Sequence, residues 1–277
     1  MWGCARAHLL PKLQKPKLLE PTRQGPTMPT HNQAFLEEQR RDIGDLRYKM
    51  EYEAEFVEDE NSFFKQDLIR ECTEDYDLLS EDQLITDERI AGNYYLGADF
   101  GKKVDYSVIA ILKQEEENQN ESYRLILLKQ FPLGTPYTDI IAHIQRLNQK
   151  LDIIKGYVDQ GAVGESLIEE IQQFAPRIDG VTFTAKTKQD LMILLQTRME
   201  QKRLILPLDR ALLSQINEQR YRFGKAVSKP TQKPEEKGTI AFYHPHGAHD
   251  DQLWALALAT YAAKEKETEP HLQVIRK

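Results

Sequence analysis

Two adjacent aspartates, Asp250 and Asp251, stand directly in front of the run "QLWALALA", which is apolar nearly all round. A helix this apolar has to be buried, and a carboxylate in apolar surroundings costs free energy unless it is paired or binds a cation. An aspartate in front of a helix also has an ordinary structural role as an N-cap. The pair therefore indicates either a helix cap or a cation site at the mouth of a core helix.

Further aspartates follow the apolar segments that predict strands. Asp99 ends "YYLGAD", Asp159 ends "IIKGYVD", and Asp105 comes where the next strand begins. Strand alternation puts Asp99 on the same face as Gly97 and on the opposite face from Ala98. Each of these aspartates alone also fits a turn. Because open α/β sheets bind ligands beyond the carboxyl ends of their strands, we expect these acids to lie near one another.

The chemistry of such a cluster follows from its donor atoms. Three or four carboxylates without cysteine ligands suit a hard cation such as Mg²⁺ or Mn²⁺. Two such ions, about 3.5–4 Å apart, can activate a water and stabilise the leaving oxygen in phosphodiester cleavage. One carboxylate must then bridge both ions, and Asp99, on the strand predicted to be most central, is the natural candidate.

The elements that must position these acids alternate along the chain. Three apolar segments that predict an antiparallel meander come first, with the polar turn "EEENQNES" between the second and third; helices and strands then alternate. The order β-β-β-α-β-α-β-α, with additions, predicts an α/β fold in which helices flank a mixed sheet. The predicted strands are 94–101, 107–114, 123–133, 153–160, 180–185, 204–207 and 238–245, and the predicted helices are 138–151, 164–174, 188–203, 210–223 and a final one after Asp251.

Composition sets further limits. The chain has 277 residues, a net charge of -7 and two distant cysteines, Cys4 and Cys72, which fit a reducing compartment and form neither a metal motif nor a disulfide framework. A negative net charge does not indicate nucleic-acid binding, although a protein with a negative net charge can still have a local basic patch. No apolar run reaches the roughly 20 residues of a membrane span.

The two ends of the chain differ from its middle in composition. Residues 1–33 predict a disordered leader, although their low content of acidic residues also fits a transit peptide. Residues 265–277 predict a disordered tail.

Three segments together resemble a known family. "YYLGADFGKKVDYSVIAIL", "GYVDQGAVGESLIEEI" and "HDDQLWALALA" are similar to the nuclease domain of the large terminase subunit of tailed bacteriophages and related viruses. The resemblance covers about residues 93–263. It implies an RNase H-like fold, with an extra β-hairpin, that cuts concatemeric viral DNA during genome packaging. Residues 34–92, helical and then acidic, look like the family's connector between ATPase and nuclease, and residues 93–264 correspond to the nuclease domain.

The resemblance implies roles for the acids. Asp99, Asp159, Asp250 and Asp251 match the catalytic metal ligands, and either of the last two can be the ligand. Asp105 matches an additional acid that lies near the metals in some members. His249 can orient an acid or a water, or equally be a partly exposed histidine before a helix cap. Two Mg²⁺ or Mn²⁺ ions are the implied cofactors.

The family's ATPase motor has no counterpart here. A phosphate-cradling G-x-x-x-x-G-K-[ST] loop is required to hold the nucleotide, and the nearest approach, "GNYYLGA", has Ala98 at the lysine position. We therefore expect no ATPase activity from this chain. The implied partners are double-stranded DNA, a portal protein, the small terminase subunit and a separate terminase ATPase, with no membrane. The implied location is the cytoplasm of the host cell.

The basic stretch "RYRFGKAVSKPTQKPEEK" suggests how DNA is held. It interleaves basic residues with Tyr221 and Phe223 in a predicted hairpin loop, which fits either a phosphate grip or a solvated loop. Further lysines occur at the start of a predicted helix and beside Asp99. The candidate DNA contacts are Arg220, Arg222, Lys225, Lys229, Lys233, Lys186 and Lys188, and more weakly Lys102 and Lys103.

Two other functions remain compatible with the same residues. Another nuclease with an RNase H fold, such as a junction resolvase, would use the same acids but prefer branched DNA. A non-catalytic packaging module that docks on a portal would depend on residues 31–92 instead of the acids.

Overall fold

The computed structural model describes residues 62–80, 83, 89–101, 104–117, 120–161, 164–223, 240–245 and 247–264. All of them belong to one of two compact units, Ala54–Lys277. The predicted leader 1–33 and tail 265–277 lie outside these residues. Within the described residues, no helix combines the length and the apolar character that crossing a membrane requires.

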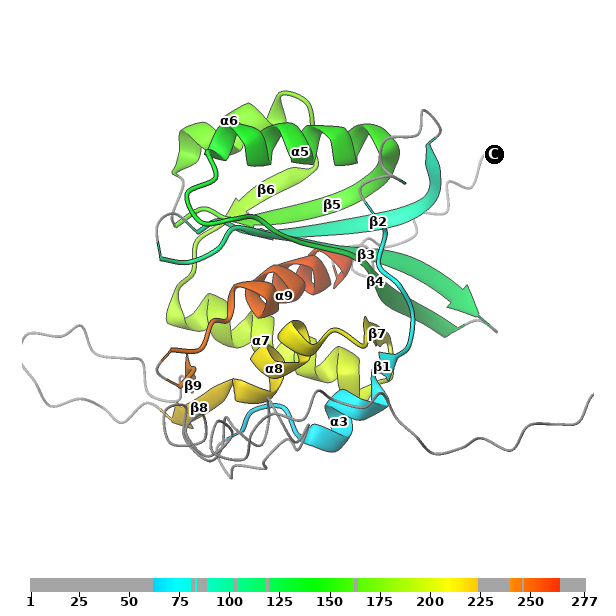
Figure 1. Cartoon of the computed structure of the whole chain (residues 1–277), viewed down its shortest axis with the longest axis vertical. Coiled ribbons are helices and arrows are strands. Elements are labelled where there is room, and N and C mark those ends of the chain that lie inside the picture. Colours follow the sequence, from blue (N-terminus) through cyan, green and yellow to red (C-terminus); the bar gives the residue numbers. More distant parts are fainter. Residues whose placement is uncertain are drawn as a thin grey trace, which may run out of the picture. The chain divides into compact units, whose positions relative to one another are not determined.

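A seven-stranded mixed sheet forms the centre of this unit (Figure 1). Its order is β1-β7-β4-β3-β2-β5-β6, and β2, β3 and β4 form the predicted antiparallel meander, whereas β5, β6, β7 and β1 join by parallel pairs. The strands are β1 Thr73–Glu74, β2 Ile90–Asp99, β3 Val108–Glu117, β4 Asn120–Gln130, β5 Leu151–Asp159, β6 Ile178–Val181 and β7 Leu204–Pro207.

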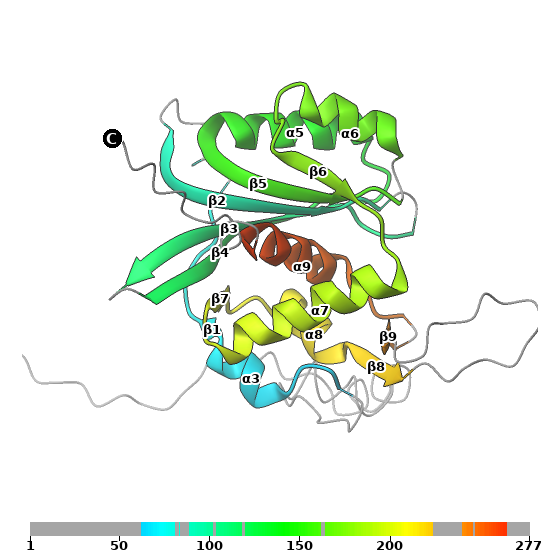
Figure 2. The same ribbon diagram turned by 180° about the vertical axis from the view of Figure 1, so that it is seen from behind.

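Helices cover both faces of the sheet. Figures 1 and 2 show α5 (Tyr137–Lys150) and α6 (Glu165–Gln172) on one face and α9 (Asp251–Lys264) against the other, with α7 (Ala185–Glu200), α8 (Arg210–Glu218) and α3 (Gln66–Glu71) beyond α9. Two hydrophobic clusters correspond to these two sides of the sheet. The arrangement confirms the predicted RNase H-like class, a mixed sheet flanked by helices.

The alternation of β2 explains how one strand serves both clusters. Leu96 and Ala98 belong to the cluster under α5 and α6, whereas Tyr95 belongs to the cluster that contains α9. Gly97 faces α9 so closely that a Cβ there would lie 2.1 Å from the carbonyl oxygen of Ala255 and 2.2 Å from the backbone nitrogen of Ala259. The predicted face of Gly97 and Asp99 is therefore the α9 face.

Several predicted boundaries differ from the structure. Strand β6 begins at Ile178, two residues before the predicted segment, and β3 and β4 continue through most of the predicted polar turn. The predicted helix 210–223 was wrong beyond Glu218, because Arg220–Phe223 is strand β8 and pairs antiparallel with β9, Ile240–Tyr243. This pairing confirms the extra hairpin.

The segment before the first predicted strand is part of the packed unit. Phe63 and Phe64 are buried, and the Phe63 ring contacts Tyr221 and Phe242 of the hairpin at centroid distances of 5.7 and 4.9 Å. The backbone N–H of Phe63 also donates to the carbonyl of Gln219 at 2.9 Å. Within the predicted connector 34–92, the residues from Ser62 onward thus add apolar side chains and strand β1 to the nuclease-like fold.

Candidate active site

The ends of two central strands bring the first two acids together. Strands β2 and β5 are parallel neighbours, with Ala98 opposite Val158, and Asp99 and Asp159 each follow directly. Neighbouring strands lie about 4.8 Å apart. Two carboxylates thus leave the same edge of the sheet side by side.

Helix α9 supplies the second pair. The helix begins at Asp251, and its tight contact with Gly97 holds this first turn close to the end of β2. Its apolar residues are buried, as the sequence predicted, and they fill the space between the sheet and α7. The packing therefore places Asp250 and Asp251 at the same end of the sheet as Asp99.

A cleft of about 460 Å³ opens at this place. Aspartates from three parts of the fold line it: Asp99 and Asp159 from strand ends, Asp105 from the β2–β3 connection, and Asp250 and Asp251 from the start of α9. The remaining lining is mostly aromatic, with one lysine. These residues are Phe100, Gly101, Phe183, Lys188, Phe242, Tyr243, His244 and Trp254.

Burial and mutual repulsion act on the strand-end acids. Burial raises the pKa of Asp99 well above its usual range, and the negative charges of Asp159, Asp251 and Asp250 raise it further, while Lys188 lowers it. Burial also raises the pKa of Asp159, against the opposing effects of a hydrogen bond from the Gly161 N–H and of Lys188. A positive charge bound at this site would therefore stabilise the ionised carboxylates.

Asp251 is the most deeply buried of the helix acids. Burial raises its pKa to about 6, with Asp105 and Asp250 adding to the rise, while the backbone N–H of Tyr106 and the charge of His249 oppose it. Its Oδ2 is buried without a hydrogen-bond partner among the described residues, and the Nδ1 of His249 lies 3.7 Å away. This carboxylate therefore has one buried oxygen that accepts no hydrogen bond from the described residues.

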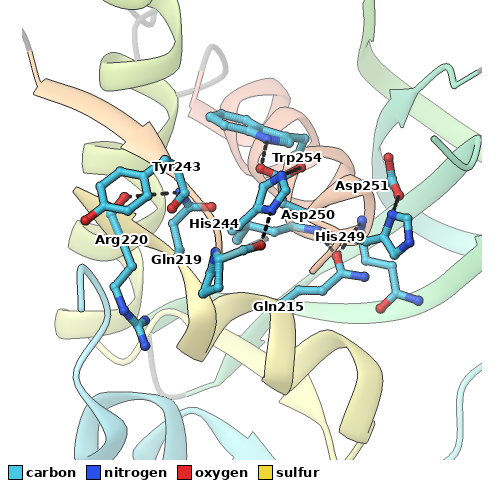
Figure 3. Close-up of polar contacts among 12 residues, drawn as sticks. Gln215, Gln219, Arg220, Tyr243, His244, His249, Asp250, Asp251 and Trp254 are labelled. Carbon is cyan, nitrogen blue, oxygen red and sulfur yellow. Dashed lines mark hydrogen bonds and ion pairs between the residues drawn. The ribbon is translucent and has the colours of Figure 1, made fainter. Parts of the chain in front are cut away.

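Asp250 is held quite differently, as Figure 3 shows. Its Oδ2 accepts a 2.9 Å hydrogen bond from the indole Nε1 of Trp254, and its Oδ1 lies 3.9 Å from the Nε2 of His244. The two adjacent aspartates are thus distinguished by their partners: Asp250 accepts a hydrogen bond from an indole, and Asp251 has one oxygen that accepts no hydrogen bond from the described residues and lies 3.7 Å from His249.

One lysine enters this acidic cleft from α7. The Lys188 Nζ lies 4.7 Å from the ring centre of Trp254 and 5.3 Å from that of Phe183. Aromatic faces attract a cation at such distances. The positive charge of Lys188 lowers the pKa of both Asp99 and Asp159, so this lysine acts on more than one of the carboxylates.

The donor set fits a hard divalent cation. Within the described part of the chain, no group of three or more His, Cys, Asp or Glu side chains is arranged to hold a metal ion as it stands. The carboxylates of Asp159, Asp250 and Asp251 nevertheless raise the pKa of Asp99, so they lie close enough to act on it. The unpartnered oxygen of Asp251 and the raised pKa of Asp99 are the features that a bound cation would relieve.

The predicted DNA contacts divide into three groups. Arg220 is buried, and its guanidinium donates to the carbonyl of Asn217 at 2.6 Å, so the structure does not place it on the exposed surface of the hairpin. Arg222 is exposed and lies over the Tyr243 ring at the cleft, Lys188 lines the cleft, and Lys186 is exposed but does not line it. The candidates Lys102, Lys103, Lys225, Lys229 and Lys233 lie outside the described residues.

The sequence did not indicate the aromatic lining. Phe183 and Trp254 contact each other at 5.1 Å between centroids, and neither was predicted to be part of the site. The signal for Trp254 was its spacing, since a residue four positions after Asp250 lies one helical turn along the same face. The signal for His244 was its place just after the hairpin strand β9.

Known proteins are similar to this chain in sequence. No family model matches the chain. It is 27% identical over 229 residues to the large terminase subunit of Thermus virus P23-45, an alignment that covers 80% of this chain and 42% of that protein. The chain thus spans less than half the length of this curated relative.

Solved structures show the same fold. The large terminase nuclease of the thermophilic phage G20c with bound magnesium aligns with a TM-score of 0.57 at 22% identity, covering 74% of this chain and 98% of that one. The form with bound cobalt aligns with a TM-score of 0.56 at 21% identity, with 74% and 98% covered. The chain is therefore a relative of terminase large subunits and has the fold of their nuclease domain.

Proposed function

We propose that this chain is a metal-dependent DNA endonuclease of the terminase type, which cuts concatemeric viral DNA during genome packaging. One observation supports it above the others: Asp99, Asp159, Asp250 and Asp251 come from three separate elements and line one cleft. Holding four carboxylates together costs free energy that a structural role does not explain. The sequence relationship to a terminase large subunit agrees with this function.

The same four aspartates are the proposed holders of the metal, together with Asp105, which also lines the cleft. Two Mg²⁺ or Mn²⁺ ions bound there would supply an activated water and stabilise the leaving oxygen of a phosphodiester. The similar nuclease of phage G20c was solved with bound magnesium and with bound cobalt, which supports a divalent cation. His249, at 3.7 Å from Asp251, is proposed to orient that carboxylate.

DNA is proposed to approach over the rim formed by the hairpin. Arg222 and Lys188 provide positive charge beside the acids, and Lys186, Lys225 and Lys229 extend it. Contacts to phosphates rather than to bases would give little sequence preference. The proposed partners are double-stranded DNA, a portal protein, a small terminase subunit and a separate ATPase, acting in the host cytoplasm. Residues 93–264 are proposed to be the nuclease domain, and residues 34–92 its connector.

A plasmid-nicking assay tests this function. Supercoiled DNA is incubated with the protein and Mg²⁺ or Mn²⁺, and the same assay is run with Asp99→Asn and Asp159→Asn. The matched control is Asp139→Asn, an exposed aspartate in the first turn of α5, on the opposite side of the sheet. We expect nicking by the wild type and the control, loss of activity of about a hundredfold or more in both site variants, and no nicking in EDTA.

Other outcomes would change the assignment. Undiminished nicking by both site variants would exclude the proposed cleft. A strong preference for branched over linear duplexes would favour a junction resolvase. Binding to a portal without cleavage at any Mn²⁺ concentration would favour a non-catalytic packaging module.

A further inference from the structure

The side chain of Trp254 contacts two groups of opposite charge. Its indole N–H donates to Asp250 at 2.9 Å, and its ring face lies 4.7 Å from the ammonium of Lys188. The residue is 4% exposed, yet it lines the cleft between them. A large buried ring with one polar edge has few alternative orientations, and this one satisfies its only donor.

Neighbouring groups fix the ring in place. The ring of Phe183 packs against Trp254 at 5.1 Å, and Lys188 also lies over Phe183. The backbone of Trp254 is held in the first turn of α9, where its N–H donates to the carbonyl of Asp250 at 2.9 Å. The ammonium of Lys188 is therefore held over two aromatic rings, and its charge lowers the pKa of both Asp99 and Asp159.

We propose that Trp254 is a positioning residue with two functions: its N–H orients the Asp250 carboxylate for a divalent cation, and its ring face holds Lys188 where it binds a DNA phosphate at the cleavage site. The inference rests on the proposed nuclease function. It adds that one ring has two separate roles. The N–H at its edge orients a metal ligand, and its face positions a lysine that binds the substrate. The two functions can be separated by substitution.

The chain offers variants that separate these functions. Trp254→Phe keeps an aromatic face but removes the N–H, and Lys188→Met removes the charge but keeps the length of the side chain. Trp254→Leu removes both the face and the N–H, and Lys188→Arg keeps the charge. Lys264→Met is the matched control, because Lys264 lies over the Tyr261 ring at 6.0 Å, at the opposite end of the same helix.

Two measurements that do not depend on cleavage test the proposal. Binding of a fluorescent DNA duplex is followed by anisotropy in EDTA over a series of potassium chloride concentrations, and Mn²⁺ binding without DNA is followed by calorimetry. We expect Lys188→Met to lower the slope of log affinity against log salt by about 0.9, the value for one lost phosphate contact, and not to weaken Mn²⁺ binding. Lys188→Arg should retain the slope.

The tryptophan variants should give the complementary pattern. Trp254→Phe is expected to weaken Mn²⁺ binding by about tenfold or more, as happens when a carboxylate ligand loses its orienting hydrogen bond, and to leave the salt slope unchanged. Trp254→Leu should lose both, and Lys264→Met neither. If Trp254→Leu does not fold, the phenylalanine and lysine variants still test each function separately.

The failure of this inference differs from failure of the nuclease assignment. Wild-type Mn²⁺ affinity in Trp254→Phe, or a wild-type salt slope in Lys188→Met, would overturn the positioning role while the wild type still nicks DNA. If the wild type neither binds nor nicks DNA with or without Mn²⁺, the proposed function itself is wrong.

Discussion

Asp99 and Asp159 are neighbours at the ends of two parallel strands. Ala98 of β2 pairs with Val158 of β5, and the two aspartates are the residues that follow this pair. No turn or loop intervenes between the sheet and either carboxylate. The sheet thus holds two carboxylates close together. Their repulsion lowers the stability of the protein when no cation is bound.

Replacing Asp99 by Asn should make the metal-free protein more stable. The pKa of Asp99 is raised well above its usual range by burial and by three neighbouring carboxylates, so a neutral side chain of the same shape removes an unfavourable charge. We expect a higher melting temperature for Asp99→Asn than for the wild type in EDTA, measured near pH 7.5. Asp139→Asn changes an exposed side chain in the first turn of α5 and should melt slightly below the wild type, because it removes a favourable charge from that helix end. A lower melting temperature for Asp99→Asn would contradict this account of the cleft.

The stability of the metal-free protein should fall as pH rises towards neutrality. The folded-state pKa of Asp251 is about 6, above its ordinary value of 3.8, so the folded state binds the proton more tightly and this stabilisation is complete below pH 3.8. It is lost as pH rises through 6, a change of about 3 kcal/mol at about 1.36 kcal/mol per pH unit. Asp99 and Asp159 shift in the same direction.

Urea titrations in EDTA at a series of pH values measure this dependence. The variant Asp251→Asn should flatten the curve between pH 4 and pH 6, and Mn²⁺ should restore stability to the wild type near neutral pH. An identical pH dependence in the wild type and in Asp251→Asn would show that this carboxylate is not the titrating group.

Introducing a methyl group at Gly97 should destabilise the whole unit. A Cβ there would meet backbone atoms of Ala255 and Ala259 at 2.1 and 2.2 Å, so α9 would have to move away from the sheet. We expect Gly97→Ala to cost about 3 kcal/mol, whereas Gly134→Ala, which meets no atom but has a φ of 80°, should cost about 1 kcal/mol. Chemical denaturation of the two variants gives both values, and equal costs would contradict the close contact.

The thiol of Cys72 should be unreactive in the folded protein. It is 3% exposed, it donates to the carbonyl of Met199 at 3.4 Å, and burial raises its pKa to about 11. In a Cys4→Ser background, Ellman's reagent should detect no thiol at pH 8 under native conditions and one in urea. Rapid native reaction would mean that the packing of α3 on the core opens readily.

The sequence predicted that the aspartates come together better than it predicted which residues surround them. The alternation of apolar residues put Asp99 on the correct face of its strand, and the apolar run after Asp251 required a buried helix. Those patterns are local. The position of Trp254 between Asp250 and Lys188 depends on how α7 packs on α9, a contact between distant segments that periodicity does not report.

The burial of Arg220 also depends on contacts that the local sequence pattern does not report. Its neighbours in the sequence are polar and basic, which favoured an exposed residue, but the carbonyl of Asn217 and the approach of Ser62 enclose its guanidinium. The burial of Phe63 and Phe64 could have been predicted from the sequence, because two adjacent aromatic residues after an acidic run indicate a packed segment. Their partners on the hairpin could not be named without the fold.

The contact of Gly97 with α9 has a mechanical consequence. Where backbone touches backbone, no side chain can change rotamer to absorb a displacement, so strand and helix behave as one stiff body. Asp99 lies two residues from this contact on the strand, and Asp251 begins the helix that it immobilises. The spacing of these two carboxylates is therefore insulated from repacking elsewhere in the core, and drift in that spacing would require the two main chains to part.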